Sequence, residues 1–286
     1  MKLRLHVASF AERELKDLLI NVRQYPLTQL HRPARELRVL MRQAEHTCSL
    51  VKNDAVLGEY FVHNNPWANR PWREFDYWNG WYALAKLREP KRILEIGTGF
   101  GFSTIALARG AGENLKLLVS LDLGNFGGLF TDEGFPEMDN LKYVWEGISR
   151  YREEDGLNFE YLQFQVNTQP QPDTDNEGNP AECSHWREDS ALMRLLHQTG
   201  FDFIFIDGKH TGDGLYNDLI SFFDYGNPGC LLVCDDLQHT DTIASMTRFV
   251  RSHRSEIAHY CIWRYLHCDA EYGGTLRRDQ GLLLKR

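Results

Sequence analysis

Three aspartates follow two apolar runs of the sequence, and their spacing could hold a metal ion. Asp207 ends the run 203–206, and Asp235 with Asp236 ends the run 231–234. If these runs are neighbouring parallel strands, about 4.8 Å apart, the three carboxylates converge at one edge of a sheet. Carboxylates that close repel one another unless they bind protons or a cation, and Mg²⁺ prefers oxygen ligands. We therefore predict a divalent cation, Mg²⁺ or another, bound by Asp207, Asp235 and Asp236.

A simpler interpretation exists for each acid taken singly. An aspartate at the end of a strand is often the N-cap of the following helix, and Asp236 could cap a helix near residue 240. The metal hypothesis depends on three acids occurring together at two strand ends.

Two basic side chains stand directly after Asp207. His210, with an ordinary pKa of about 6.5, is suited to accept a proton from a hydroxyl at neutral pH. Lys209 could do so instead if burial lowered the pKa of its ammonium group. We predict a catalytic role for His210 or Lys209, and the alternative for His210 is a surface histidine in the loop before a helix.

A glycine loop, Gly-Thr-Gly-Phe-Gly at 97–101, follows the apolar run 92–96. A tight turn from a strand into a helix favours residues without a Cβ, and it lets a ligand approach the helix N–H groups. A dinucleotide site prefers Gly-x-Gly-x-x-Gly/Ala, but the third small position is Phe102 here. Asp122 lies 21 residues after Gly101, at the end of the next predicted strand, where an acid can accept both hydroxyls of a ribose.

These residues require a scaffold in which strands and helices alternate. We expect strands at 92–96, 116–122, 159–166, 203–207 and 230–235, and helices at 102–108, 140–150, 191–198, 213–223 and 240–253. Such alternation implies a parallel sheet with right-handed crossovers. Two further strands, 260–266 and 281–285, are too close for a crossover helix and should pair antiparallel. The predicted fold is α/β: a Rossmann-like, seven-stranded, mostly parallel sheet with an antiparallel last strand and helices on both faces.

Two segments depart from this alternation. Residues 1–90 are predicted to form an N-terminal helical extension before the domain 91–286, with helical spacing at 10–23, 35–44 and 74–87. This extension caps the core, or its aromatic residues form a substrate lid: Phe61, Trp67, Trp72 and Tyr77. The polar insertion 168–188 is either a disordered surface segment or a lid, with His185 and Trp186 as candidate contacts.

Composition excludes several classes of protein. The net charge of −8 disfavours binding along a nucleic-acid backbone, so we expect no nucleic-acid partner. No run of 18 apolar residues and no signal peptide are present, so we expect no membrane partner. Six cysteines without Cys-x-x-Cys spacing indicate a reduced, cytoplasmic protein without disulfides. The N-terminal helices would cap the chain's own site or exchange with a second copy in a homodimer, and both remain open.

The motifs together resemble a known family. The spacing Gly-x-Gly-x-Gly preceded by Glu95 resembles the first motif of class I S-adenosylmethionine-dependent methyltransferases. The run FIDGKHTGDGLYNDL, followed by PGCLLVCDD, resembles the metal-dependent small-molecule O-methyltransferases, including macrocin-type sugar O-methyltransferases and the related cephalosporin hydroxylase-like proteins. The resemblance covers about residues 90–286. It implies that Mg²⁺ is held by the acids at 207, 235 and 236, holds two substrate oxygens, and has a base beside it at His210.

The resemblance also implies a cofactor site for S-adenosylmethionine. The residues expected there are Glu95, Gly97, Thr98, Gly99, Gly101, Ser103, Asp122 and Asp207. Many relatives carry Gly-Asp-Ser after the third strand, near the adenine, whereas this chain has Val-Asn-Thr at 166–168. We therefore choose Asn167 for the adenine contact.

The predicted function is metal-assisted transfer of a methyl group from S-adenosylmethionine to a hydroxyl of a small-molecule acceptor. One alternative is a cephalosporin hydroxylase-like metal-dependent oxidoreductase, although no two-histidine, one-carboxylate set has clear spacing. Another is a protein that binds S-adenosylmethionine without catalysis. A nicotinamide dehydrogenase is disfavoured by Phe102.

Overall fold

The structure is a computed structural model that describes residues 35–51, 78–99, 101–124, 140–170, 184–269 and 274–286. The expected helix 10–23 lies outside the described residues. So do Phe61, Trp67, Trp72 and Tyr77, the aromatic residues considered for a substrate lid.

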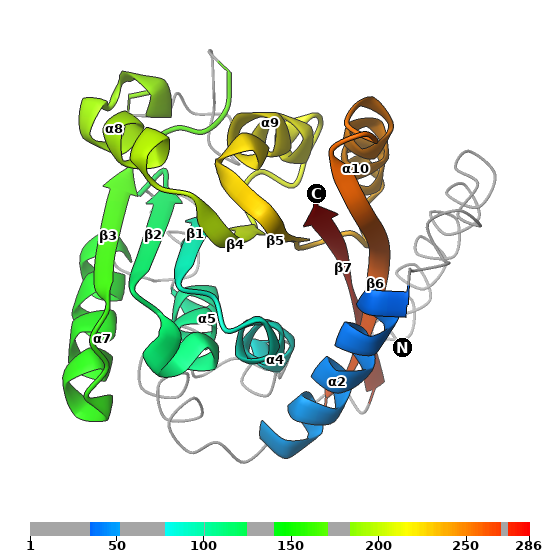
Figure 1. Cartoon of the computed structure of the whole chain (residues 1–286), viewed down its shortest axis with the longest axis horizontal. Coiled ribbons are helices and arrows are strands. Elements are labelled where there is room, and N and C mark those ends of the chain that lie inside the picture. The colour runs from blue at the N-terminus through cyan, green and yellow to red at the C-terminus, as the bar shows by residue number, and fades with distance from the viewer. Residues whose placement is uncertain (1–34, 52–77, 100, 125–139, 171–183, 270–273) are drawn as a thin grey trace, which may run out of the picture.

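The central element is one sheet in the order β3-β2-β1-β4-β5-β7-β6 (Figure 1). Its strands are β1 (Arg92–Ile96), β2 (Leu117–Asp122), β3 (Glu160–Gln165), β4 (Phe201–Ile206), β5 (Gly226–Cys234), β6 (Ile257–Asp269) and β7 (Gly274–Lys285). Strands β1 to β5 pair in parallel, and β7 lies antiparallel between β5 and β6. This confirms the predicted seven-stranded sheet with its antiparallel last strand.

The hairpin β6–β7 is longer than the expected strands 260–266 and 281–285. Its pairing continues through Arg264 opposite Asp279 to Asp269 opposite Gly274. Hydrophobic periodicity underestimated both strands because these outer positions include charged residues, whereas their pairing depends on backbone hydrogen bonds.

Helices cover both faces of the sheet. They are α2 (Arg35–Val51), α4 (Trp78–Arg88), α5 (Phe102–Ala111), α7 (Asn140–Asp155), α8 (Ser190–Gln198), α9 (Gly214–Phe222) and α10 (Thr240–Ser252). Helices α8, α9 and α10 lie on one side of the sheet, and α2, α4 and α5 lie on the other (Figure 1). Each side has its own hydrophobic cluster, which explains why the central strands read as continuous apolar runs.

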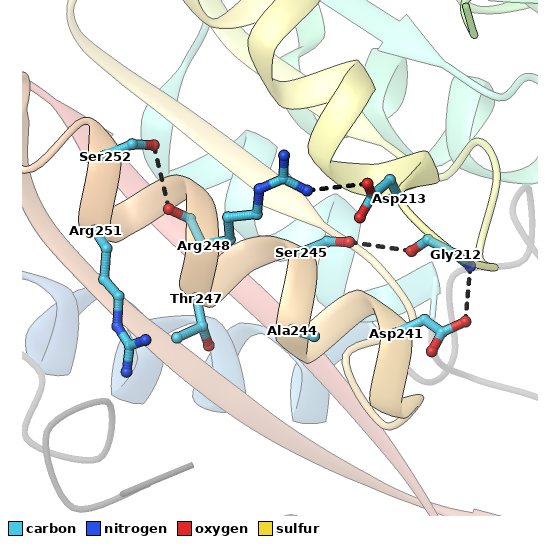
Figure 2. Close-up of a pocket in the computed structure, with 9 residues that line it drawn as sticks. All are labelled: Gly212, Asp213, Asp241, Ala244, Ser245, Thr247, Arg248, Arg251 and Ser252. Atoms are coloured by element: carbon cyan, nitrogen blue, oxygen red, sulfur yellow. Dashed lines mark hydrogen bonds and ion pairs between the residues drawn. The ribbon is translucent and has the colours of Figure 1, made fainter. Parts of the chain in front are cut away.

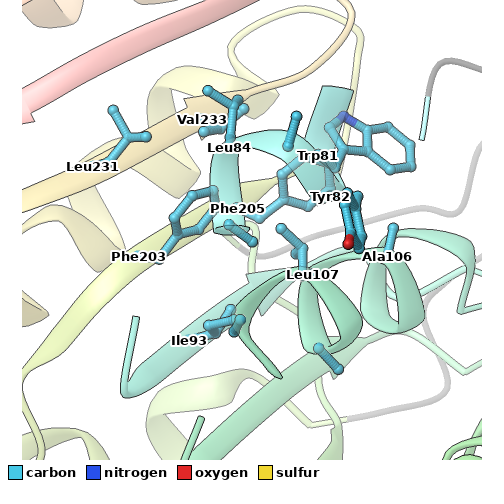
Figure 3. Close-up of a cluster of buried hydrophobic side chains, with 14 of the residues drawn as sticks. Trp81, Tyr82, Leu84, Ile93, Ala106, Leu107, Phe203, Phe205, Leu231 and Val233 are labelled. Carbon is cyan, nitrogen blue, oxygen red and sulfur yellow. The ribbon is translucent and has the colours of Figure 1, made fainter. Parts of the chain in front are cut away.

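Strand β4 shows how one apolar run serves both clusters. Phe203 and Phe205 face the cluster under α4 and α5, and Ile204 and Ile206 face the opposite cluster. In the first cluster the ring of Trp81 meets Phe205 edge-on, with 5.0 Å between ring centroids (Figure 3). Because both faces are packed, the ends of β4 and its neighbours are held rigidly, and these ends carry the candidate site.

The described N-terminal helices belong to the same core. Helix α2 reaches β6 through a hydrogen bond from Trp263 Nε1 to Glu45 Oε1 (3.2 Å), and Leu37 and Ala44 join the cluster that α4 and α5 share. Helices α2 and α4 therefore pack into a core that they share with the rest of the domain. The division of the chain at residue 90 stays a prediction.

The ends of the insertion 168–188 are ordered parts of the fold. Asn167 and His185 form a parallel backbone bridge, and Trp186 is 2% exposed and packs on Phe222 with ring centroids 4.9 Å apart. The interpretation of the whole insertion as a disordered segment is therefore wrong at its C-terminal end, and Trp186 is a core residue rather than a lid contact. Residues 171–183 lie outside the described residues.

Two further expectations concern cysteines and membranes. Within the described residues, Cys48, Cys230, Cys234 and Cys261 are buried free thiols. None of the helices described has both the length and the apolar character needed to cross a membrane.

Candidate functional site

The glycine loop joins β1 to α5 in the conformation that its composition predicts. Gly97, Gly99 and Gly101 have φ values of +87°, +52° and +80°, a region that residues with a side chain rarely adopt. A Cβ at Gly97 would also overlap the backbone carbonyl of Asp207 at the end of β4. The loop therefore needs glycine at 97 for two reasons, its backbone conformation and its direct contact with the neighbouring strand end.

Asp122, at the end of β2, closes this loop. Its Oδ2 accepts hydrogen bonds from the backbone N–H groups of Thr98 (2.8 Å) and Gly99 (2.9 Å), and its Oδ1 accepts one from Gly124 N–H (2.8 Å). Asp122 thus lies beside the glycine loop, as its predicted cofactor role requires.

Glu95 lies beneath the loop and is fully buried. Its carboxylate accepts hydrogen bonds from three hydroxyls: Ser103 (2.6 Å), Thr104 (2.7 Å) and Ser120 (2.5 Å). Burial outweighs these bonds and, with the nearby charge of Asp122, raises the pKa of Glu95 to about 7. In this structure Glu95 and Ser103 tie the first turn of α5 to β1 and β2, and their direct contact with a cofactor stays a prediction.

A second cluster lies where β4 and β5 end. One ligand atom from each of Asp207, His210 and Asp236 lies within 4.8 Å of the others. His210 Nε2 is 3.2 Å from Asp207 Oδ1, and His210 Nδ1 contacts Asp236 Oδ2. Each ring nitrogen lies beside a carboxylate at ion-pair distance, and two neighbouring negative charges favour the charged imidazolium. The two acids therefore overcome the opposing effect of burial and raise the pKa of His210 to about 11.

Asp236 has an unusual backbone for a residue with a side chain. Its φ is +58°, and its carbonyl accepts a hydrogen bond from Thr242 Oγ1 (2.6 Å) in α10. Such a conformation costs about 1–3 kcal/mol and is commonly found at functional sites. Here it accompanies the turn of the Asp236 side chain toward His210, and α10 begins later, with His239 as its N-cap. The N-cap interpretation of Asp236 is therefore wrong.

Comparison with known proteins identifies the family of this chain. Residues 94–237, half of the chain, match the sequence profile of the family described as a methyltransferase domain. The chain belongs to this methyltransferase family. The match spans the glycine loop and all three aspartates, and it confirms a class I S-adenosylmethionine-dependent methyltransferase. No curated protein matches the chain.

Solved structures of methyltransferases are similar to this methyltransferase at low identity. An O-methyltransferase from Bacillus cereus in complex with SAH is 18% identical, with 81% of this chain and 91% of that chain covered and a TM-score of 0.49. An O-methyltransferase from Streptomyces achromogenes involved in tomaymycin synthesis, in complex with SAM, is 19% identical, with 76% and 87% covered and a TM-score of 0.42. The family assignment rests on the sequence profile.

Lys209 and Asp235 line the same small cavity as Asp207 and His210, but Asp235 is not part of the converging set of metal-ligating atoms. Asp235 is buried, and its Oδ1 accepts a hydrogen bond from Gln280 Nε2 of β7 (3.4 Å). Lys209 is half-buried, with its carbonyl packed under Gly214. His239 is exposed, as expected for a residue at a helix start. The metal role of Asp235 and the catalytic role of Lys209 stay predictions.

Asn167, the residue chosen for the adenine contact, is fully buried after β3. Its Oδ1 accepts a hydrogen bond from Gln169 N–H (2.8 Å), while its Nδ2 has no acceptor among the described residues. A buried donor of this kind is costly unless something else accepts from it. Asn167 therefore has the chemistry of a ligand contact.

Sequence reasoning missed several polar residues that support the site. Ser120 interrupts the apolar strand LLVSLD and bonds to Glu95, and Gln238 Nε2 donates to Asp236 Oδ1 (2.5 Å). The hydroxyl inside an otherwise apolar strand was a signal that could have been used, because a buried polar group requires a partner. Nothing local marked Gln238.

A groove of about 700 Å³ lies between α10 and the loop that follows His210 (Figure 2). Its polar groups mostly bond to one another: Arg248 contacts Asp213 (2.9 Å), and Gly212 N–H donates to Asp241 Oδ2 (2.7 Å). These contacts anchor the far end of the loop that carries His210 onto α10.

Proposed function

We propose that this methyltransferase transfers the methyl group of S-adenosylmethionine to a hydroxyl of a small-molecule acceptor, assisted by a divalent cation. The observation that carries the proposal is the cluster of Asp207, His210 and Asp236 directly beside the glycine loop. A proton acceptor and a pair of carboxylates thus adjoin the loop that is expected to hold the cofactor.

The cofactor site is built from the ends of β1, β2 and β3. S-adenosylmethionine supplies the methyl group as an electrophilic sulfonium. The glycine loop, with Thr98, Gly99 and Gly101, lets the cofactor approach the backbone, and Asp122 accepts from its ribose hydroxyls. Asn167 donates to its adenine, for which its buried Nδ2 is suited. These residues orient the cofactor, and orientation of two bound reactants can lower a barrier by about 7–11 kcal/mol.

The donor set at the second cluster fits a divalent cation. Asp207 and Asp236 offer carboxylate oxygens that already lie close together, and both side chains are mostly buried, at 23% and 9% exposure. Two carboxylates suit a hard divalent cation such as Mg²⁺ or Mn²⁺. When bound, such a cation supplies Lewis acidity that lowers the pKa of a hydroxyl.

His210 has two states that depend on how its carboxylates are neutralised. Alone with Asp207 and Asp236, it keeps its own proton. A positive charge held by the same carboxylates would oppose the imidazolium and lower the pKa of His210 toward its ordinary value. A neutral His210 could then accept the proton of the acceptor hydroxyl, to which it is accessible because its side chain is 38% exposed.

The acceptor class follows from charge and from the site. An acidic chain of net charge −8 is poorly suited to a nucleic acid, so we propose a small molecule with a hydroxyl beside a second oxygen. Reduced buried thiols agree with a cytoplasmic protein.

Methyl transfer from labelled S-adenosylmethionine to a panel of sugar, catechol and polyketide hydroxyls tests this function. We expect transfer that stops with EDTA, returns with Mg²⁺ or Mn²⁺, and is lost in Asp207→Ala although S-adenosylhomocysteine still binds by calorimetry. Asp202→Asn, at the opposite end of β4, is the matched control and should stay active. Undiminished transfer in EDTA or in Asp207→Ala would refute the role of the cation, and transfer only to amines would refute O-methylation.

A further inference from the structure

Asp218, in α9, has a carboxylate that neither proposed site uses. The residue is fully buried, and its Oδ1 accepts a hydrogen bond from Gln169 Nε2 at 2.7 Å. A buried carboxylate is costly, and it is retained only where hydrogen bonds hold it in place. The neighbours of the Asp218 carboxylate therefore indicate its role.

The Asp218 carboxylate faces the backbone of the loop that follows β4. A Cβ on Gly208 would lie 2.7 Å from Asp218 Oδ2, so the carboxylate is packed directly against Gly208. Gly208 is the residue after Asp207 and two residues before His210. A shift of Asp218 would therefore shift the loop that carries two members of the Asp207–His210–Asp236 cluster.

Gln169 fixes Asp218 from the other side. It is buried, and its Nε2 also reaches the carbonyl of Gly214 (3.3 Å), while its Oε1 accepts from Asn217 Nδ2 (3.2 Å). Its backbone N–H donates to Asn167 Oδ1. Gln169 thus connects the segment after β3, where the adenine contact is proposed, with the first two turns of α9.

We propose that Gln169 and Asp218 are a positioning pair that sets the loop 207–210 and thereby the affinity of the site for its divalent cation. The inference rests on the proposed function, because it assumes that the cluster binds a cation. The pair acts through Gly208, and residues that hold metal ligands in place typically change metal affinity by about 10–100-fold when they are altered.

The test measures two affinities in each variant: Mn²⁺ by electron paramagnetic resonance of the free ion, and S-adenosylhomocysteine by calorimetry. In Asp218→Ala and Gln169→Leu we expect Mn²⁺ to bind about tenfold more weakly, with S-adenosylhomocysteine affinity within about twofold of the unchanged protein. Asp218→Asn keeps an oxygen that can accept from Gln169, so it should restore Mn²⁺ affinity to within about twofold of the unchanged protein.

A matched control separates positioning from loss of stability. Asp202 lies at the opposite end of β4, where its carboxylate accepts from Lys91 N–H and Arg92 N–H (both 3.1 Å). Asp202→Ala should lower the melting temperature without changing Mn²⁺ affinity. If Asp218→Ala does not fold, the comparison of Gln169→Leu with Asp218→Asn decides the question.

Each remaining outcome is decisive. Unchanged Mn²⁺ affinity in Gln169→Leu would overturn the positioning role, and so would equal weakening of both ligands. Weak binding in Asp218→Asn would also overturn it, because charge rather than position would then matter. If the unchanged protein binds no Mn²⁺, the cation site and the positioning pair both fail. If it binds Mn²⁺ but transfers no methyl group, the proposed function fails and the positioning pair stands.

Discussion

Gly97 of the glycine loop lies directly against the backbone carbonyl of Asp207, and the N–H of Asp207 donates to the carbonyl of Ile96 (2.8 Å). The backbone at the end of β1 is therefore in direct contact with the backbone at the end of β4. The loop expected to hold the cofactor and the acid expected to hold the cation share this boundary. A change at Gly97 should be felt at both sites.

Gly97→Ala tests this boundary. The substitution adds a Cβ in a backbone region that costs about 1–3 kcal/mol, and it forces Asp207 to move. We expect S-adenosylhomocysteine to bind at least about tenfold more weakly by calorimetry, with a lower free energy of unfolding in urea. Gly112→Ala is the matched control, because Gly112 also has a positive φ (+58°) but a Cβ there meets no atom within 4 Å. Equal effects of the two substitutions would show that contact with Asp207 is unimportant.

Asp122→Asn should weaken the cofactor site. The amide can still accept from Thr98 N–H and Gly99 N–H through its oxygen, but its NH₂ group then faces the N–H of Gly124. The substitution removes a charge-assisted hydrogen bond and places two N–H donors against each other. Together these changes cost about 1.5–3 kcal/mol, or about 10–100-fold in S-adenosylhomocysteine affinity measured by calorimetry. Unchanged affinity would remove Asp122 from the cofactor site.

The raised pKa of Glu95 predicts a dependence of stability on pH. Its native pKa of about 7 exceeds the ordinary value of 4.5, so the folded state binds more protons than the unfolded state between these values. The contribution of Glu95 to the free energy of unfolding is fully present below pH 4.5. It is lost as pH rises through 7, by at most about 1.4 kcal/mol per pH unit. Urea unfolding at several pH values should show the unchanged protein losing stability relative to Glu95→Gln over this range. A constant difference would contradict the prediction.

His210 should titrate differently with and without a cation. Without one, contacts with Asp207 and Asp236 keep the ring protonated up to a pKa of about 11. With Mg²⁺ on the same carboxylates, the pKa of His210 should fall toward its ordinary value. Nuclear magnetic resonance of the imidazole, assigned with His210→Gln, measures both values. A pKa that Mg²⁺ leaves unchanged would argue against a shared site, and a pKa near 6.5 without Mg²⁺ would contradict the observed geometry.

The sequence predicted which residues meet where neighbouring strands of the sheet end. Asp207 and Asp236 meet because β4 and β5 are neighbouring parallel strands, and the two apolar runs made that pairing foreseeable. Asp235 and Asp236 were expected to face the same site, although consecutive residues leaving a strand point to opposite sides. Asp235 accordingly points to Gln280 of β7, while the positive φ of Asp236 accompanies its turn to His210.

Contacts between segments far apart in the chain could not be predicted. The pairing of Gln169 with Asp218 joins residues separated by a polar insertion, a helix and a strand. Likewise, Trp186 belongs to a stretch that reads as too polar to pack, yet its ring lies in the core against Phe222. Side-chain partners of this kind depend on the tertiary fold, and local composition carries no signal for them.

A crystal structure with S-adenosylhomocysteine and Mn²⁺, with the ion located by its anomalous scattering, tests the central claim most directly. We predict one Mn²⁺ ion bound by oxygens of Asp207 and Asp236, and ribose hydroxyls hydrogen-bonded to Asp122. A ribose bound away from Asp122, or a cluster of Asp207, His210 and Asp236 that holds no ion at saturating Mn²⁺, would contradict the account of a metal-assisted methyltransferase.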